Sequence, residues 1–303
     1  MKRIFRQLPF LILVGIFFYL NSVLIAYPAL APTANIKILG ASTSEQEILQ
    51  NFKSFEVATD NSINSVRAAS FLIQDLDSNQ LIGAHHPDTS LPVASLTKLM
   101  TVWTALQYAD MDEVVTVNHS AYETVSPSLG LLVGDEVKLS DLIYACLIGS
   151  SNDAARTIAD YIGTKMNLPF SELMNQQAAQ LGMKNSRFSN AMGFDSVVNY
   201  SSARDLSLLV KALTETGVFE QTWQAGNYRF TGKLGRIYQT TATNKLLNTY
   251  PDLRAIKTGF TNTALGSMIT VVTTGTSRTL IIVIGSPDRE GDTLQLRAKI
   301  LAR

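Results

Sequence analysis

A serine and a lysine three residues apart are the first pair in this chain that could carry out nucleophilic chemistry. Ser95 and Lys98 begin a mostly apolar run that ends near Tyr108 and predicts a buried helix. Positions i and i+3 share one helix face. A serine hydroxyl needs a base to take its proton, and burial or a second cation lowers a lysine pKa enough to make it that base. Alone, the pair also fits a capped helix with a solvated lysine.

Two further polar motifs follow along the chain. Ser150 and Asn152 lie at a predicted turn between two helices, residues 140–148 and 153–162, and this turn could present polar groups to a cleft. Lys257-Thr258-Gly259 closes a predicted strand. The turn by itself also reads as a simple capping turn. In this order, on a helix start, an inter-helix turn and a strand end, the three motifs are typical of penicillin-binding proteins and class A β-lactamases.

The remaining pattern predicts an α+β fold. An antiparallel β-sheet flanked by helices, with an inserted helical lobe, explains the order of strands, many helices, strands and a last helix. The cleft between the lobes is a usual place for a ligand. Besides the helices above, the expected helices are 170–181, 206–215 and 292–302, and the expected strands are 69–74, 80–84, 114–117, 228–231, 253–258, 267–273 and 278–284. We expect Ser140-Asp141 to cap one helix and Gly163 to end the next.

Charge and cysteine content exclude several classes of protein. The 303 residues include 25 basic and 25 acidic side chains, so the balance favours neither nucleic acid nor an acidic partner. The single Cys146 excludes an intramolecular disulfide framework, and its apolar helical surroundings predict a buried, inert thiol. His85, His86 and His119 show no metal-ligand spacing, so we expect neither a metal site nor a cofactor.

The N-terminus reads as an export segment. Lys2, Arg3 and Arg6 precede a long apolar run, and residues 8–27 are about long enough to span a bilayer. Residues 1–31 are therefore a cleaved signal or an uncleaved membrane anchor, and Pro32, which we expect to hinder cleavage, favours the anchor. Residues 32–65 read as a linker. With either N-terminal segment, the rest of the chain lies outside the cytoplasm; we expect residues 66–303 to form a single domain, and the resemblance described next implies that it is catalytic and lies in the periplasm or on the cell-wall side.

From about Val66 onward, the chain resembles the serine D-alanyl-D-alanine carboxypeptidases, which are low-molecular-mass penicillin-binding proteins. The resemblance rests on the three motifs and on residues 91–101, 142–155, 181–183, 202–206 and 256–261. It implies the penicillin-binding protein and β-lactamase-like fold. The separate C-terminal β-rich domain and amphipathic anchor of many members have no counterpart in this sequence, so the N-terminal segment is the expected tether.

The resemblance also implies a reaction. Ser95 attacks the carbonyl between two D-alanines of a peptidoglycan stem peptide while Lys98 accepts its proton, and water later hydrolyses the acyl-enzyme, so no cofactor is needed. Ser150 is expected to relay a proton to the leaving amine, and Asn152 to hold the substrate amide. β-Lactams, which mimic this peptide end, are the expected inhibitors. Lys257 is expected to keep a positive charge that lowers the Lys98 pKa.

The substrate-binding residues follow from the same resemblance. Lys257, Thr258 and Thr261 are expected near the substrate carboxylate, and Arg289 is a weaker candidate for the same task. Gly259 completes the Lys-Thr-Gly motif. The backbone N–H groups of Ser95 and Phe260 are expected to form an oxyanion hole, which typically lowers a barrier by ~3–4 kcal/mol.

Three other classes of protein could carry these motifs. A D,D-endopeptidase that cleaves peptidoglycan cross-links stays open, because members without the extra C-terminal domain include such enzymes. A β-lactamase needs a group that speeds deacylation; Glu172 and Asn175 are tempting, but they lie in a predicted helix soon after Asn152. A non-catalytic wall-binding pseudoenzyme is disfavoured because Ser95 and Lys98 are intact.

Overall fold

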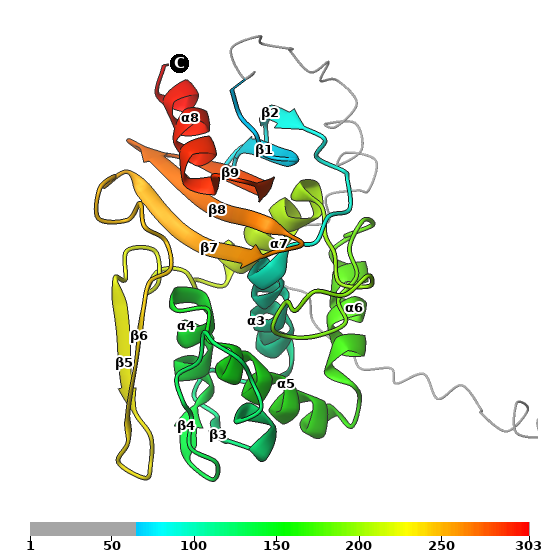
Figure 1. The fold of residues 1–303 in the computed structure, drawn as a ribbon, viewed down its shortest axis with the longest axis vertical. Helices are drawn as coiled ribbons and strands as arrows, with labels where there is room; N and C mark the ends of the chain where they lie inside the picture. Colours follow the sequence, from blue (N-terminus) through cyan, green and yellow to red (C-terminus); the bar gives the residue numbers. More distant parts are fainter. Residues whose placement is uncertain (1–64, 303) are drawn as a thin grey trace, which may run out of the picture. The chain divides into compact units, whose positions relative to one another are not determined.

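The computed structural model describes residues 65–302, and a five-stranded antiparallel sheet is its central element (Figure 1). The strand order is β2-β1-β9-β8-β7, so the first two strands pair with the last three. The bounds are β1 (Ser70–Asp75), β2 (Leu81–His85), β7 (Leu253–Thr261), β8 (Leu265–Thr274) and β9 (Ser277–Ser286).

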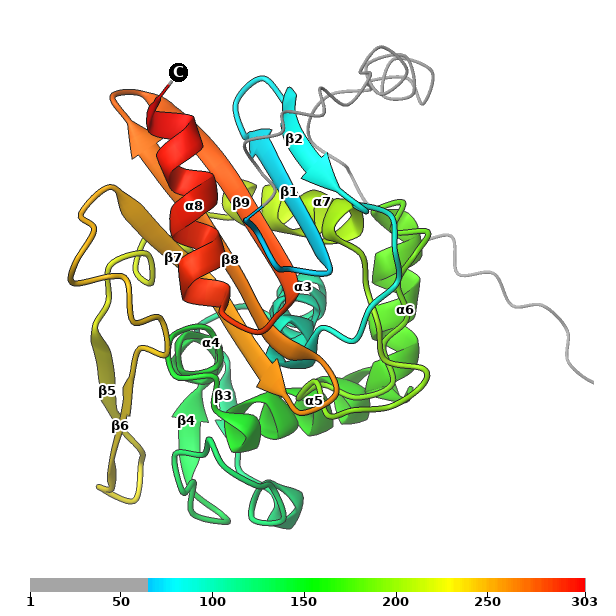
Figure 2. The same ribbon diagram turned by 45° about the horizontal axis from the view of Figure 1, so that its top comes forward.

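Helices cover both faces of this sheet. Strand side chains alternate between faces, and in β9 residues Leu280, Ile282 and Ile284 enter the larger core while Ile281 and Val283 enter the smaller one. The larger core packs against α3 (Thr97–Tyr108) and α7 (Ala203–Glu215), and the smaller one against α8 (Arg289–Leu301). Figure 2 shows α8 in front of the sheet, with α3 and α7 behind it. Burial on both faces explains the unbroken apolar run of β9.

The expected helical lobe is inserted between β2 and β7. It contains α4 (Leu139–Ile148), α5 (Asn152–Met166) and α6 (Phe170–Gln180), which pack with α3 in the larger core. Two small hairpins accompany the helices, β3 (Val114–Thr116) with β4 (Glu136–Lys138) and β5 (Asn227–Thr231) with β6 (Ile237–Thr241). Two 3-10 turns, η2 (Ala94–Leu96) and η3 (His119–Ala121), complete the described elements. The predicted α+β class and the inserted lobe are confirmed.

Two predicted helix boundaries are wrong. Ser140 does not cap α4, because that helix begins one residue earlier and no side chain caps it. Gly163 does not end α5, which continues to Met166 and stops where Asn167 adopts a left-handed φ of 52°. A glycine only weakens a helix interior, whereas the left-handed residue turns the chain away.

The boundaries of β7 and α7 also differ from the prediction. The Lys257-Thr258-Gly259 motif lies inside β7, since pairing with β8 continues to the Thr261–Leu265 pair. Helix α7 begins at Ala203, where the Ser202 hydroxyl accepts the Asp205 N–H. Strands β4 and β6 were not predicted, because each is short and pairs with only one other strand. The remaining predicted strands and helices are confirmed to within a few residues.

The predicted anchor at residues 8–27 and nearly all of the predicted linker at 32–65 lie outside the described residues. Within residues 65–302, none of the helices has the length and apolar character needed to span a bilayer.

The loop between α6 and α7 lies directly against the turn that precedes α3. Gly193 has a φ of +86°, and a Cβ there would lie 2.0 Å from the Ala94 carbonyl oxygen. Gly182 has a similar φ of +74°, but its Cβ would meet nothing within 4 Å. The absence of a side chain at Gly193 therefore allows this loop to pack directly on the Ser95 segment.

We expect Gly193→Ala to destabilise the protein more than Gly182→Ala. A left-handed alanine costs roughly 1–2 kcal/mol in both variants, and the backbone clash adds a further loss of about 2 kcal/mol or more only at Gly193. Urea unfolding followed by circular dichroism measures the difference. Equal losses in the two variants would contradict the close packing of Gly193 on Ala94.

Candidate active site

The Ser95 hydroxyl lies on a strained turn at the start of α3. Ser95 is in the middle of η2, and Ala94 before it has a φ of 47°, which is unusual for a residue with a side chain. Val93 and Leu96 are fully buried and fix the turn in the larger core. Strain of this kind persists only where the surroundings impose it, and it gathers at functional sites.

The Lys98 amine is fully buried and has three oxygen neighbours. Its Nζ lies 2.9 Å from Ser95 Oγ, 2.7 Å from Asn152 Oδ1 and 2.6 Å from the Met192 carbonyl oxygen. An ammonium donates to all three oxygens. A neutral amine donates to the two carbonyl oxygens, and its lone pair is left for the Ser95 hydroxyl proton. The geometry therefore accommodates both protonation states that a general base must adopt.

Burial also brings the Lys98 pKa into a useful range. Desolvation of the ammonium lowers the pKa of Lys98 to about 8. The Lys257 pKa lies well below its usual value, first because that amine is buried and second because Lys98 repels its charge. Desolvation, rather than the expected charge of Lys257, is therefore the leading cause of the low Lys98 pKa. In the free protein, burial and mutual repulsion disfavour two charged amines at once.

The carboxamide of Asn152 is oriented by the loop between η3 and β4. Its Nδ2 donates to the Val125 carbonyl at 2.8 Å, so Oδ1 faces Lys98. The Asn152 backbone N–H donates to the Pro127 carbonyl at 2.7 Å. Two carbonyls of one loop thus hold the first residue of α5 and leave the second Nδ2 proton for a substrate.

Asp153 holds that loop and was missed as a site residue. Its buried carboxylate accepts the hydroxyl of Ser128 at 2.7 Å and the backbone N–H groups of Leu129 at 3.0 Å and Leu131 at 3.1 Å. An aspartate in the first turn of a helix ordinarily reads as a partner of the helix dipole. Only the folded loop shows that it positions the carbonyls that orient Asn152.

Ser150 is buried and lies two residues before Asn152, on the turn between α4 and α5. Its φ of 62° is left-handed, so this turn is strained like the one at Ala94. Within the described part of the chain, its hydroxyl forms no hydrogen bond. The role of Ser150 as a proton relay remains a prediction.

Strand β7 passes over the start of α3. A Cβ at Gly259 would lie 2.9 Å from the Val93 carbonyl oxygen and 3.1 Å from the Ser95 nitrogen, so only glycine fits here. Phe260 follows Gly259 and has an exposed side chain. An oxyanion hole formed by the N–H groups of Ser95 and Phe260 remains a prediction. Lys257 is buried, and its Nζ donates to the Thr258 carbonyl at 2.9 Å.

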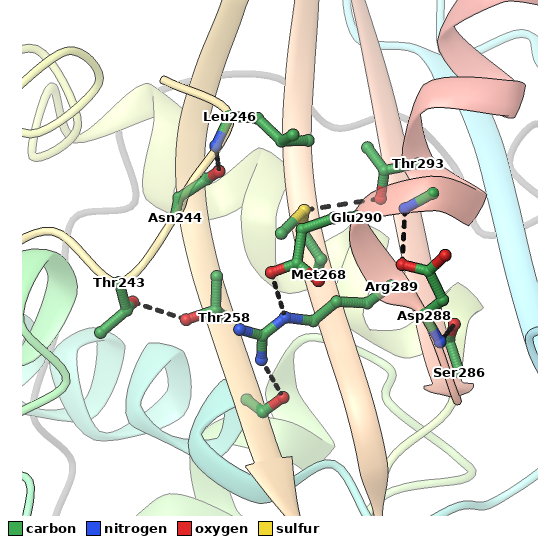
Figure 3. Close-up of polar contacts among 12 residues, drawn as sticks. Thr243, Asn244, Leu246, Thr258, Met268, Ser286, Asp288, Arg289, Glu290 and Thr293 are labelled. Atoms are coloured by element: carbon green, nitrogen blue, oxygen red, sulfur yellow. Dashed lines mark hydrogen bonds and ion pairs between the residues drawn. The ribbon is translucent and has the colours of Figure 1, made fainter. Parts of the chain in front are cut away.

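Arg289 lies across the same strand. Its guanidinium donates to the Gly259 carbonyl at 2.7 Å and to Glu290 at 3.1 Å (Figure 3). Thr243 was not predicted at the site, yet its hydroxyl is hydrogen-bonded to that of Thr258 (Figure 3). No sequence motif marks Thr243, because it precedes Thr258 by fifteen residues, in the segment after β6.

The predicted site residues fall into two groups. Ser95 and Asn152 both contact the Lys98 amine, while the β7 residues approach Ser95 through the backbone at Gly259. Within residues 65–302, no group of three or more histidine, cysteine, aspartate or glutamate side chains is placed to bind a metal ion. The Cys146 thiol is buried, and burial raises its pKa to about 12, which fits an inert thiol. The arrangement supports acyl transfer to serine with a lysine as base.

We expect Asp153→Asn to reduce acylation of Ser95 by at least tenfold while the protein stays folded. The carboxamide has one acceptor oxygen instead of two, so donors of the loop lose their acceptor and Asn152 shifts; a displacement of about 1 Å can cost on the order of a hundredfold in rate. Stopped-flow acylation by a penicillin, measured against pH, is the readout.

Asp77→Asn is the control, because Asp77 is exposed and is ion-paired with Arg278 on β9 rather than with the loop. We expect it to acylate at the wild-type rate. A normal rate and an unchanged pH profile in Asp153→Asn would show that the loop does not orient Asn152.

Comparisons with known proteins agree with this geometry. The model of the peptidase S11 family, described as D-alanyl-D-alanine carboxypeptidase, matches residues 56–288. D-alanyl-D-alanine carboxypeptidase DacC of Escherichia coli is 32% identical over 233 residues, which are 73% of this chain and 57% of that protein. A D-alanyl-D-alanine endopeptidase of Pseudomonas aeruginosa is 30% identical over 226 residues, 72% of this chain and 71% of that protein.

A solved structure shows the same fold. The Streptomyces K15 DD-transpeptidase matches with a TM-score of 0.73 and 25% identity, covering 79% of this chain and 98% of that one. The chain spans between 57% and 60% of the length of the first carboxypeptidase relatives. Because the family model matches well over half of its residues, the chain belongs to the peptidase S11 family of D-alanyl-D-alanine carboxypeptidases.

Proposed function

We propose that this protein is a serine D,D-carboxypeptidase that removes the terminal D-alanine from peptidoglycan stem peptides through an acyl-enzyme on Ser95. The observation that carries this proposal is the set of oxygens around Lys98. Two carbonyl oxygens take its N–H groups, and the third neighbour is the hydroxyl whose proton the reaction must remove.

The first half of the reaction uses these groups in order. The neutral Lys98 amine takes the proton of Ser95 as its Oγ attacks the penultimate D-alanine carbonyl. The N–H groups of Ser95 and Phe260 stabilise the oxyanion. The Lys98 ammonium then passes the proton from Ser95 through the Ser150 hydroxyl to the leaving amine, so Ser150 ends the step as a hydroxyl. The second Nδ2–H of Asn152 donates to the carbonyl of the substrate amide. Water then releases the shortened peptide from Ser95.

The substrate carboxylate is assigned to the cationic end of β7. Lys257 becomes more basic when an anion binds beside it, and Thr258 offers a hydroxyl positioned by Thr243. Arg289 is held next to Gly259 and adds a guanidinium that can bind a carboxylate. Penicillins carry a carboxylate at the same place, which supports their proposed role as covalent inhibitors.

We place this activity outside the cytoplasm, in cell-wall remodelling. The basic start and the apolar residues 8–27 support a membrane anchor, followed by a linker and the catalytic domain at 66–303. The neutral net charge supports no nucleic-acid partner. No cofactor takes part in the proposed reaction.

A D,D-endopeptidase that cleaves cross-links is the second candidate. It is favoured by one comparison, because the chain spans 71% of the Pseudomonas aeruginosa endopeptidase but only 57% of DacC. Both activities use the same acyl-enzyme, so they differ only in the size of the leaving group that the site accepts.

We expect fluorescent penicillin to label the full-length protein at Ser95 and Ser95→Ala to remain unlabelled, because no other hydroxyl contacts Lys98 in the described structure. Peptide mapping locates the label. Mass spectrometry of muropeptides after incubation separates loss of one D-alanine from cleavage of cross-linked dimers. Labelling that persists in Ser95→Ala would overturn the assignment, and rapid drug turnover without a lasting adduct would indicate a β-lactamase.

We expect the acylation rate to rise with pH and to level off above the Lys98 pKa of about 8. Below this pH the amine holds its proton and cannot act as a base. Lys98→Arg should be nearly as inactive as Lys98→Ala, because a guanidinium stays protonated. Lys138→Arg is the control, since Lys138 is exposed and paired with Asp112. A near-normal rate for Lys98→Arg would assign the proton to another group.

A further inference from the structure

The Thr261 hydroxyl, which we expect from the sequence to lie near the substrate carboxylate, already forms two hydrogen bonds. It accepts the Ala264 backbone N–H at 2.9 Å and donates its proton to Asp195 Oδ1 at 2.7 Å. A hydroxyl has a single proton to donate. A substrate carboxylate is only an acceptor, so it can bind Thr261 only after Asp195 gives up this hydrogen bond.

Asp195 belongs to a loop that is fixed against the nucleophile turn. Asn190 Oδ1 accepts the N–H groups of Gly193 at 2.7 Å and Phe194 at 3.0 Å. Gly193 packs on the Ala94 carbonyl, and the carbonyl of Met192 accepts from Lys98. Asp195 therefore belongs to the same short loop that contacts Lys98, and the hydrogen bonds and packing of this loop fix its position beside the end of β7.

Asp195 also brings a negative charge to the place where an anionic substrate end should bind. The Glu290 carboxylate differs from that of Asp195, because it is ion-paired with Arg289, which donates to the Gly259 carbonyl on β7. Asp195 is exposed, and within residues 65–302 its side chain accepts a hydrogen bond from the neutral Thr261 hydroxyl. Its charge therefore opposes an incoming carboxylate in two ways, through repulsion and through competition for the Thr261 proton.

We propose that Asp195 is a specificity-determining residue that competes with the substrate carboxylate for the Thr261 hydroxyl. The inference rests on the proposed function, because it requires a substrate with an anionic end. It implies that, in the free enzyme, the Asp195 carboxylate occupies the place of the substrate carboxylate at Thr261. The preference for peptides that end in a carboxylate is therefore weaker than Lys257 and Arg289 alone would produce.

The test compares two acyl-peptides that differ only at their ends, D-Ala-D-Ala and D-Ala-D-Ala amide. The measured quantity is the ratio of kcat/KM for the acid to that for the amide, with the full-length protein. Asp195→Asn keeps the shape but removes the charge, and Asp195→Ala also frees the Thr261 proton. We expect both variants to raise the ratio by roughly two- to fivefold, the effect of one nearby charge at the protein surface.

Two further variants serve as controls. Asp112→Asn removes an exposed carboxylate that is paired with Lys138 and not with Thr261. The ratio should therefore stay at its wild-type value. Thr261→Val removes the donor and should lower the ratio. An unchanged or lower ratio in both Asp195 variants overturns the proposal. A wild-type protein that releases D-alanine from neither peptide overturns the proposed function and this inference with it.

Discussion

The burial of one amine is the constraint on which the rest of the site depends. Lys98 can act as a base near neutral pH only because the fold removes it from water, which lowers its pKa to about 8. Such burial is unfavourable unless the amine keeps hydrogen-bond partners. Asn152 Oδ1 and the Met192 carbonyl supply them from two separate segments. Both segments must therefore be fixed before the base exists, and each is held by a network of its own.

The two segments are held by different kinds of interaction. The Asn152 side is polar: Asp153 ties the loop through hydrogen bonds to Ser128 and two backbone N–H groups, and the loop carbonyls set the amide. The Met192 side depends on close backbone packing, with Gly193 against Ala94. Gly259 approaches the same turn from β7. Strain at Ala94 and Ser150 is tolerated because the core of the sheet and helical lobe holds both turns in place.

The loop that holds the base also reaches the substrate end of the site. Met192 contacts Lys98, while Asp195, three residues later, contacts Thr261 on β7. In the reaction proposed above, a change in this loop would affect both the proton transfer and the recognition of the leaving residue. This coupling gives the loop more influence on specificity than its lack of regular secondary structure suggests.

The sequence by itself determined the α+β class, the order of the three motifs and the pairing of Ser95 with Lys98. These follow from local periodicity and from an i, i+3 spacing that any helix imposes. It did not determine that β7 extends to Thr261, that Gly163 lies inside a helix, or that Asp153, Asp195 and Thr243 contact the segments that carry the candidate site residues. Those features depend on contacts between residues far apart in the chain, such as Thr243 with Thr258 or Asp195 with Thr261. Only the tertiary structure decided which buried oxygens surround the amine, because burial and partner geometry are properties of the packed fold rather than of any local pattern.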